Sequence, residues 1–214
     1  MEYNVLIIGG GPSGLSSAIK IKQLASAEGK DVSVCVLEKG SEIGAHILSG
    51  NVFEPTALNE LIPDWKEKEA PLNSPATKDI VKFMISENSS INIPFPSFLI
   101  PTFNNHGNYV MSLANFTRWL ATQAESFGVE IFPGFTAAEV IFEENVVKGV
   151  LTGELGISKD GEKKPSYQPS MELRGKYTVF AEGCRGHLGK QLIKKFNLDE
   201  NRDPQHYGIG FKEI

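Results

Sequence analysis

The first part of the chain changes from a continuous apolar run to apolar residues at helical spacing. Residues 5–8 are all apolar, which is typical of a strand that is buried on both faces of a sheet. Between residues 15 and 24, apolar residues recur with the period of an amphipathic helix. A second, mainly apolar run covers residues 32–37. The pattern therefore predicts a strand, a helix and a second strand in immediate succession.

Periodicity, proline and glycine together predict the remaining elements. Residues 135–142 and 146–152 flank a short polar turn and are expected to form an antiparallel hairpin, which residues 171–174 extend. Residues 177–181 are expected to form the last buried strand. Further helices are expected over residues 55–61, 113–127 and 190–196, further strands over 80–85, 108–112, 129–132 and 207–211, and surface segments over 64–75 and 158–170.

The segment between Glu87 and Arg118 contains no Lys, Arg, Asp or Glu. Three prolines between residues 94 and 101 exclude a regular helix, because each ring removes a hydrogen bond and clashes with the preceding turn. We therefore expect an extended segment, with a hairpin tip near residues 96–99. Two interpretations are open: the segment packs under another part of the protein, or its aromatic side chains enter a membrane interface or a partner's groove.

A glycine-rich loop, residues 9–14, joins the first strand to the first helix with the spacing G-x-G-x-x-G. In a dinucleotide site Gly9 would permit the tight turn, Gly11 would let the backbone approach a pyrophosphate, and Gly14 would let the helix pack on the strand. Glu38 ends the second apolar run 24 residues beyond Gly14, near the roughly 20 residues at which such sites carry the acid that binds ribose. The spacing alone arises by chance, so the strand, the helix and the acid together predict a dinucleotide site.

Composition narrows the classes of partner. The formal net charge of −5, without any basic stripe, argues against nucleic acid, which requires clustered Lys and Arg. Cys35 and Cys184 are too few for a disulfide framework or a metal site, so reduced thiols are expected. Met1 stands almost directly before the first strand, so we expect no signal or transit peptide. No apolar run is long enough to span a bilayer.

The last predicted strand runs into a second glycine loop, residues 182–189. A flavin dinucleotide is long, and its flavin half needs a second close approach of the backbone, which Gly183 and Gly186 can provide. FAD is therefore favoured over a nicotinamide cofactor. Cys184 and His187 lie in the same loop, but no third partner is identifiable, so a nucleophile and base are not expected there.

Seven short motifs together resemble the electron-transfer flavoprotein-ubiquinone oxidoreductase family. They are GGGPSG (9–14), EKG (38–40), GAHILSG (44–50), NHGNY (105–109), VEIFPG (129–134), AEGCRG (181–186) and DPQHYG (203–208). The resemblance covers essentially the whole chain. AEGCRG is specific, because many related flavin hydroxylases carry an aspartate where Glu182 stands.

The resemblance implies an FAD enzyme that takes electrons from reduced electron-transfer flavoprotein and passes them to ubiquinone at a membrane surface. The expected location is the cytoplasmic face of a bacterial inner membrane, or the matrix side of the mitochondrial inner membrane. It also implies that the apolar segment is a membrane-contacting hairpin, and that this chain is an N-terminal fragment. Members of the family continue into a quinone-binding region and an iron–sulfur cluster, which two cysteines alone cannot ligate.

The expected fold class is α/β, a Rossmann-type FAD-binding domain like those of glutathione reductase and flavin hydroxylases, with an antiparallel β insert and the apolar hairpin. The expected organisation is a β-α-β start over residues 1–62, an insert over 63–110 with its apolar hairpin at about 91–103, and the rest of the FAD domain over 111–214 with a β-hairpin insert at about 135–174. Two alternatives stay open: a related FAD-dependent reductase or hydroxylase acting on an isoprenoid or aromatic substrate, and a non-catalytic module that binds FAD or membrane.

No catalytic or metal-binding residue is predicted, since electron transfer needs proximity and a tuned flavin more than an acid or a base. For Ser49, Gly50 and Arg118 simple turn chemistry or an exposed helix charge is the alternative to a cofactor contact. The candidate cofactor-binding residues are Gly9, Gly11, Pro12, Ser13, Gly14, Glu38, Lys39, Ser49, Gly50, Arg118, Ala181, Glu182 and Gly183. The candidate membrane contacts are Ile93, Phe95, Phe98, Leu99 and Ile100.

Overall fold

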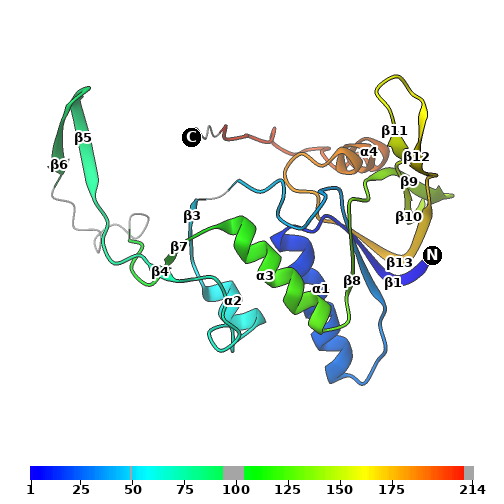
Figure 1. Cartoon of the computed structure of the whole chain (residues 1–214), viewed down its shortest axis with the longest axis horizontal. Helices are drawn as coiled ribbons and strands as arrows, with labels where there is room; N and C mark the ends of the chain where they lie inside the picture. The colour runs from blue at the N-terminus through cyan, green and yellow to red at the C-terminus, as the bar shows by residue number, and fades with distance from the viewer. Residues whose placement is uncertain (49, 94–103, 210–214) are drawn as a thin grey trace.

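A six-stranded sheet forms the centre of the computed structural model, which describes residues 1–48, 50–93 and 104–209 (Figure 1). The strand order is β8-β2-β1-β13-β10-β9. The parallel strands are β8 (Glu130–Pro133), β2 (Val34–Glu38), β1 (Glu2–Ile8) and β13 (Glu172–Phe180). The antiparallel pairs join β13 to β10 (Val146–Thr152) and β10 to β9 (Ala137–Glu143). The expected β-α-β start and the 135–152 hairpin are both confirmed.

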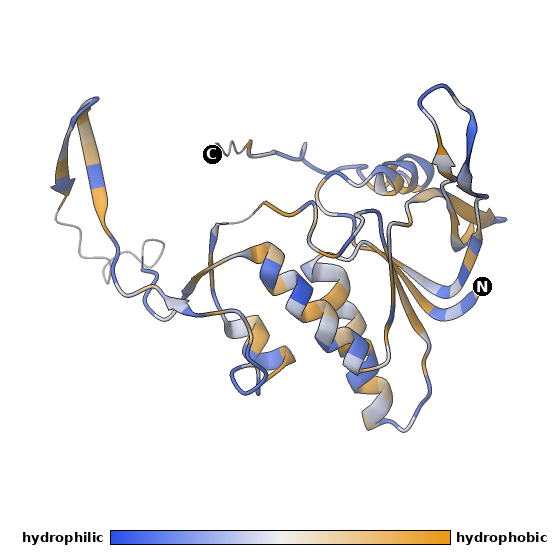
Figure 2. Ribbon diagram, viewed as in Figure 1, coloured by the Kyte–Doolittle hydropathy of each residue, from blue (hydrophilic) through white to orange (hydrophobic). Residues whose placement is uncertain are grey.

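Both faces of the parallel sheet are covered, which explains the uninterrupted apolar run of β1. Val5 and Ile7 point to one face, under α1 (Pro12–Ala27) and α3 (Leu113–Ser126). Leu6 and Ile8 point to the other, where they pack with β9, β10 and the first turn of α4 (His187–Phe196). The strands of the parallel sheet are coloured mainly as hydrophobic in Figure 2.

Strand β13 replaces the two separate strands that were expected over residues 171–174 and 177–181. Its first residues pair with β10 antiparallel, and from Arg174 to Phe180 it pairs with β1 in parallel. Gly149 of β10 has φ +151°, and a Cβ there would lie 2.0 Å from the carbonyl oxygen of Leu173. One long strand therefore joins the antiparallel and parallel halves of the sheet, with glycine at the crowded point.

The segment over residues 64–75 is partly buried, so the expectation of a surface segment is wrong there. Trp65 is 5% exposed, and its Nε1 donates to Oδ1 of Asn59 at 2.7 Å. Its ring meets Tyr109 edge-on at a centroid distance of 5.8 Å. The segment follows α2 (Thr56–Leu61) and belongs to a small sheet of β3 (Asn51–Phe53), β7 (Tyr109–Met111) and β4 (Ser74–Pro75). Its short-range polarity hid these long-range contacts.

A two-stranded ribbon of β5 (Val81–Ser86) and β6 (Ser89–Ile93) extends away from the rest of the molecule (Figure 1). It turns at residues 87–88, and the tip expected at 96–99 lies outside the described residues. Pairing of Phe83 with Ile91 and of Val81 with Ile93 places apolar side chains on one face of the ribbon. Phe83 and Ile91 are 62% and 56% exposed, so this face is open.

Two further expectations near the end of the chain differ from the structure. Residues 158–170, expected to be a loop, include the strand β12 (Lys163–Gln168), which pairs with β11 (Leu155–Ile157) in an exposed ribbon. Residues 207–209, the described part of the strand expected over 207–211, form no strand. Among the described residues, no helix has the length and apolar character needed to cross a bilayer.

The two leucines of α1 provide a matched test of the core. Leu15 is fully buried and Leu24 is 53% exposed. We expect Leu15→Ala to lower the free energy of unfolding by about 2–5 kcal/mol, because it leaves a cavity between α1 and the sheet. Leu24→Ala is expected to change it by no more than about 0.5 kcal/mol. Denaturant titrations measure both values, and equal losses would contradict this packing of α1.

Candidate functional site

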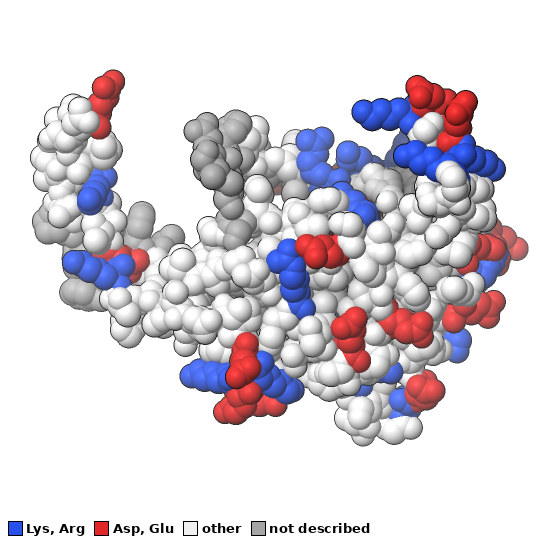
Figure 3. Space-filling model, viewed as in Figure 1, with Lys and Arg blue, Asp and Glu red and all other residues white. Residues whose placement is uncertain are grey.

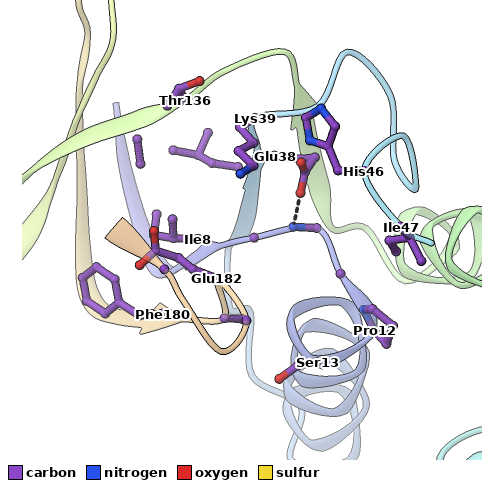
Figure 4. Close-up of a pocket in the computed structure, with 18 of the residues that line it drawn as sticks. Ile8, Pro12, Ser13, Glu38, Lys39, His46, Ile47, Thr136, Phe180 and Glu182 are labelled. Atoms are coloured by element: carbon purple, nitrogen blue, oxygen red, sulfur yellow. Dashed lines mark hydrogen bonds between the residues drawn. The ribbon is translucent and has the colours of Figure 1, made fainter. Parts of the chain in front are cut away.

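A cavity of about 690 Å³ lies at the carboxyl ends of β1, β2 and β13. This is the edge of a parallel sheet at which ligands bind in doubly wound folds. Its wall is formed by both glycine loops, by the segment after β2 and by the connection from β8 to β9 (Figure 4). A volume of this size is typical of cofactor and small-molecule sites.

Gly9 and Gly14 are required by the close contact of three backbones. Gly9 has φ +110°, and a Cβ on it would lie 2.4 Å from the carbonyl oxygen of Ala181, at the end of β13. A Cβ on Gly14 would lie 2.0 Å from the carbonyl oxygen of Gly9. The first glycine loop therefore fits between α1 and the second glycine loop only because both residues lack side chains.

Gly11 differs from these two glycines, because a Cβ on it would meet no atom within 4 Å. It is the N-cap residue of α1, and among the described residues no side chain caps this helix. The other two long helices are served by side chains: Ser112 accepts from the N–H of Asn115 in α3, and Glu182 reaches the first turn of α4. The N-terminus of α1 thus keeps free N–H groups beside the cavity, the arrangement that binds phosphate.

Glu38 ties the first glycine loop to the segment after β2. Its Oε2 accepts from the N–H of Gly10 at 2.8 Å (Figure 4). Its Oε1 accepts from the N–H of Gly40 at 2.7 Å. A carboxylate has about four acceptor positions on its two oxygens. Glu38 also lines the cavity, so it retains acceptor capacity for a hydroxyl group.

Glu182 performs a similar task in the second glycine loop. Its Oε2 accepts from the N–H of Gly189 at 2.8 Å, its Oε1 accepts from the N–H of Leu188 at 3.3 Å, and Nδ1 of His187 lies 3.3 Å from Oε1. The side chain is 11% exposed. A Cβ on Gly186 would lie 2.4 Å from the Cβ of Glu182, so glycine is needed there. The negative charge of Glu182 faces the positive end of the α4 dipole, which stabilises it in the cavity wall.

Most of the predicted cofactor residues come together at this cavity, but some do not. Gly50 and Arg118 are not in its wall. Arg118 forms an exposed ion pair in which Nη2 lies 3.0 Å from Oε1 of Glu42. Ser49 lies outside the described residues. The predicted residues that line the cavity are Gly9, Gly11, Pro12, Ser13, Glu38, Lys39, Ala181, Glu182 and Gly183, while Gly14 lies just behind it.

Sequence patterns did not reveal the wall formed by the β8–β9 connection, residues 135–137. The N–H of Phe135 donates to the carbonyl oxygen of Glu38 at 3.0 Å, and the N–H of Gly134 donates to that of Gly40 at 2.7 Å. These bonds hold the connection against the segment after β2. Because they join segments far apart in the chain, no local signal could have found them. His46 is exposed and also lines the cavity.

The two cysteines have opposite environments. Burial, with a smaller contribution from the charge of Glu130, raises the pKa of Cys35 to about 12. Cys184 is exposed in the second glycine loop. Within the ranges that the structure describes, no group of three or more His, Cys, Asp or Glu is arranged to hold a metal ion. The strand ends, the two glycine loops and the open start of α1 together have the arrangement of a dinucleotide-binding site.

Comparison with known proteins first identifies the fold class of the chain. Residues 7–62 match the NAD(P)-binding Rossmann-like domain family. The chain resembles the solved structure of aklavinone-11 hydroxylase in complex with FAD and aklavinone, with a TM-score of 0.59 and 19% identity over 89% of this chain and 34% of that one. It also resembles a geranylgeranyl bacteriochlorophyll reductase-like protein from Thermoplasma acidophilum, with a TM-score of 0.57 and 22% identity over 84% and 39% of the two chains. Identities this low show a shared fold alone, the Rossmann-type fold of FAD-dependent enzymes.

The particular resemblance comes from more similar sequences. The whole chain is 59% identical to the electron transfer flavoprotein-ubiquinone oxidoreductase of Pseudomonas aeruginosa and 50% identical to the mitochondrial protein of that name from Homo sapiens. It covers 39% and 34% of those two proteins, so it spans little more than a third of the length of the curated relatives it matches. The resemblance predicted from the sequence motifs is confirmed over the full chain.

The two glycines of the first loop give a test of this geometry. We expect Gly14→Ala to lower the free energy of unfolding by about 2 kcal/mol or more, because its methyl group overlaps the carbonyl oxygen of Gly9. Gly11→Ala enters open space with an N-cap φ of −79°, so it is expected to cost at most about 1 kcal/mol. Thermal or denaturant unfolding compares the two. The geometry would be refuted if Gly11→Ala proved the more damaging substitution.

Proposed function

We propose that this chain forms the FAD-binding portion of an oxidoreductase that carries electrons from reduced electron-transfer flavoprotein to ubiquinone. The cavity carries the proposal, because it combines an open helix N-terminus at Gly11 with a second glycine junction at Gly183. The names of the relatives supply the donor and the acceptor. Bound FAD supplies the electron-accepting group.

The residues of the cavity fit FAD in separate roles. N–H groups at the start of α1, next to Gly11 and Ser13, suit the pyrophosphate. Glu38 has acceptor capacity for a ribose hydroxyl of the adenosine half. Gly183 has φ +81° and open space where a side chain would begin, so its backbone can approach the flavin half. Glu182 holds the start of α4 in the wall beside it.

Such a site needs no proton-transfer residue of its own. The protein's tasks in electron transfer are to bind the cofactor, to keep it in a fixed orientation and to set the charge around it. Two carboxylates, Glu38 and Glu182, lie in the wall, and each accepts hydrogen bonds from two backbone N–H groups. These bonds hold the carboxylates in place and compensate their charge. The wall is therefore polar, and neither carboxylate is left without hydrogen-bond donors.

For the apolar segment, we propose contact with the surface of a membrane. Ile93, the last residue of β6, is 40% exposed. It lies on the apolar face of the β5–β6 ribbon, and in the sequence it is followed by Phe95, Phe98, Leu99 and Ile100, which are outside the described residues. A bacterial enzyme would then sit on the cytoplasmic face of the inner membrane, and a mitochondrial one on the matrix side. The iron–sulfur cluster that the resemblance implies would need ligands besides Cys35 and Cys184.

FAD binding and electron uptake test the proposal. The chain should bind FAD with a flavin-like absorbance spectrum, and reduced electron-transfer flavoprotein should bleach that spectrum under anaerobic conditions. We expect Gly11→Ala to weaken FAD binding by about tenfold or more, equivalent to about 1.4 kcal/mol, because its methyl group occupies the space where the pyrophosphate approaches. Gly208→Ala, which also enters open space but lies outside the cavity wall, is the control.

Each result has a distinct meaning. If the chain retained no flavin spectrum after saturation with FAD and removal of the unbound FAD, a cofactor site in this chain would be ruled out. If FAD binds but stays oxidised when reduced electron-transfer flavoprotein is added, the proposed donor is ruled out and the cofactor is kept.

Membrane contact predicts a separate loss. In the complete enzyme, changing Phe95, Phe98 and Leu99 to Ser should reduce co-sedimentation with phospholipid vesicles severalfold, because apolar side chains at the interface contribute in proportion to the area they bury. Leu24→Ser with Leu198→Ser, two exposed leucines elsewhere, should leave it unchanged. Equal sedimentation of the triple variant and the unsubstituted enzyme would refute the contact.

A further inference from the structure

A line of basic side chains runs along the exposed side of α4 and begins at the cavity. Arg185 and His187 line the cavity, and Lys190 and Lys194 follow His187 at intervals of three and seven residues. Residues at this spacing share one side of a helix. All four are exposed. We call these four residues the α4 basic face, and Lys and Arg side chains gather over this helix in the space-filling view (Figure 3).

The opposite side of α4 holds the helix on the sheet, so the basic face is exposed among the residues that the structure describes. Leu188 is fully buried and Leu192 packs against the same core. Lys195 points away from the basic face, with Nζ 4.6 Å from the centre of the Phe142 ring. Phe196 packs on that same ring at a centroid distance of 6.0 Å. The orientation of α4 is therefore fixed by apolar contacts that leave the basic face outward.

Among the described residues, His187 is the member of this face that contacts a carboxylate, with Nδ1 3.3 Å from Oε1 of Glu182. None of Arg185, Lys190 and Lys194 takes part in an ion pair within the part of the chain that the structure describes, although the chain as a whole has a net charge of −5. Arg185 stacks over the ring of Tyr207 at 5.2 Å, a contact that keeps its charge.

Stabilisation of the helix accounts for only part of this arrangement. A lysine in the last turn, such as Lys194, favours the negative end of the helix dipole. Lys190 lies near the positive end and Arg185 precedes the helix, so the dipole does not favour either of them. The basic residues begin in the cavity wall and lie on a protein of negative net charge. Another explanation is therefore needed, which is recognition of a negatively charged molecule.

We propose that the α4 basic face is the docking surface for the protein that delivers electrons, and that it binds carboxylates on that protein. This inference rests on the proposed function, because it assumes that the donor is a protein. A ten-residue helix is about 15 Å long, so a partner seated on α4 stays next to the cavity at its first turn. Opposite charges speed encounter and orient the partner, and transient redox complexes form small, weak interfaces.

Charge reversal on the face tests this assignment. The variants are Lys190→Glu with Lys194→Glu, and, as a control with the same change in net charge, Lys20→Glu with Lys159→Glu. All four lysines are exposed, lie outside the cavity wall and lack ion pairs among the described residues. The FAD-loaded proteins are mixed with purified electron-transfer flavoprotein, and the association rate is measured by stopped-flow fluorescence at low and high salt.

We expect the reversal on α4 to lower the association rate at low salt by about tenfold or more and to remove most of its salt dependence, while FAD content stays the same. The control pair should stay within about twofold of the unsubstituted protein. Equal rates for the two double variants would overturn the docking surface while leaving the donor in place.

Two other results are also decisive. If the unsubstituted, FAD-loaded protein did not associate with electron-transfer flavoprotein at all, the proposed donor would fail, and the docking surface with it. If the α4 reversal instead abolished binding to vesicles containing phosphatidylglycerol and left association with the flavoprotein unchanged, the face would bind anionic lipid and the inference would be wrong.

Discussion

The contact of three backbones at Gly9 is the constraint on which the rest of the structure depends. The chain leaves β1, turns at Gly9 and enters α1, and the same residue lies against Ala181 at the end of β13. Because neither Gly9 nor Gly14 has a side chain, α1 can start directly above the sheet edge. This places the open end of α1, both glycine loops and the cavity together. Any larger residue would separate them and move the N–H groups away from the cavity.

Two carboxylates then hold the loops that this contact brings together. Glu38 binds the N–H groups of Gly10 and Gly40, and Glu182 binds those of Leu188 and Gly189. Hydrogen bonds to an ionised acceptor are stronger than those between neutral groups, so each tie stabilises its loop. The acid at the end of β2 therefore shapes the first glycine loop, in addition to the ribose contact proposed for it. This structural role explains why carboxylates occur in the cavity wall among apolar residues such as Ile8 and Leu37.

Local sequence predicted the parts of the fold that local physics determines. The apolar run of β1 and the period of α1 follow from burial on two faces and on one, and both were correct. The first glycine loop was recognisable because the spacing of its glycines is required by one particular backbone geometry. The burial of Trp65 and the position of Phe135 in the cavity wall were missed, because each depends on contacts with a segment distant in the chain. The continuous β13 was missed for the same reason, because its two halves are defined by different partner strands.

The two surfaces proposed for contact with other molecules lie far apart. The β5–β6 ribbon extends from one side of the molecule, whereas α4 covers the sheet on the other (Figure 1). An isolated two-stranded ribbon is at best marginally stable in water, and this one exposes Phe83 and Ile91, so its apolar face favours an apolar environment. The basic side of α4 is suited to the opposite, a solvated and charged partner. A membrane at the ribbon would therefore leave α4 and the neighbouring cavity accessible to a protein that arrives from the aqueous phase.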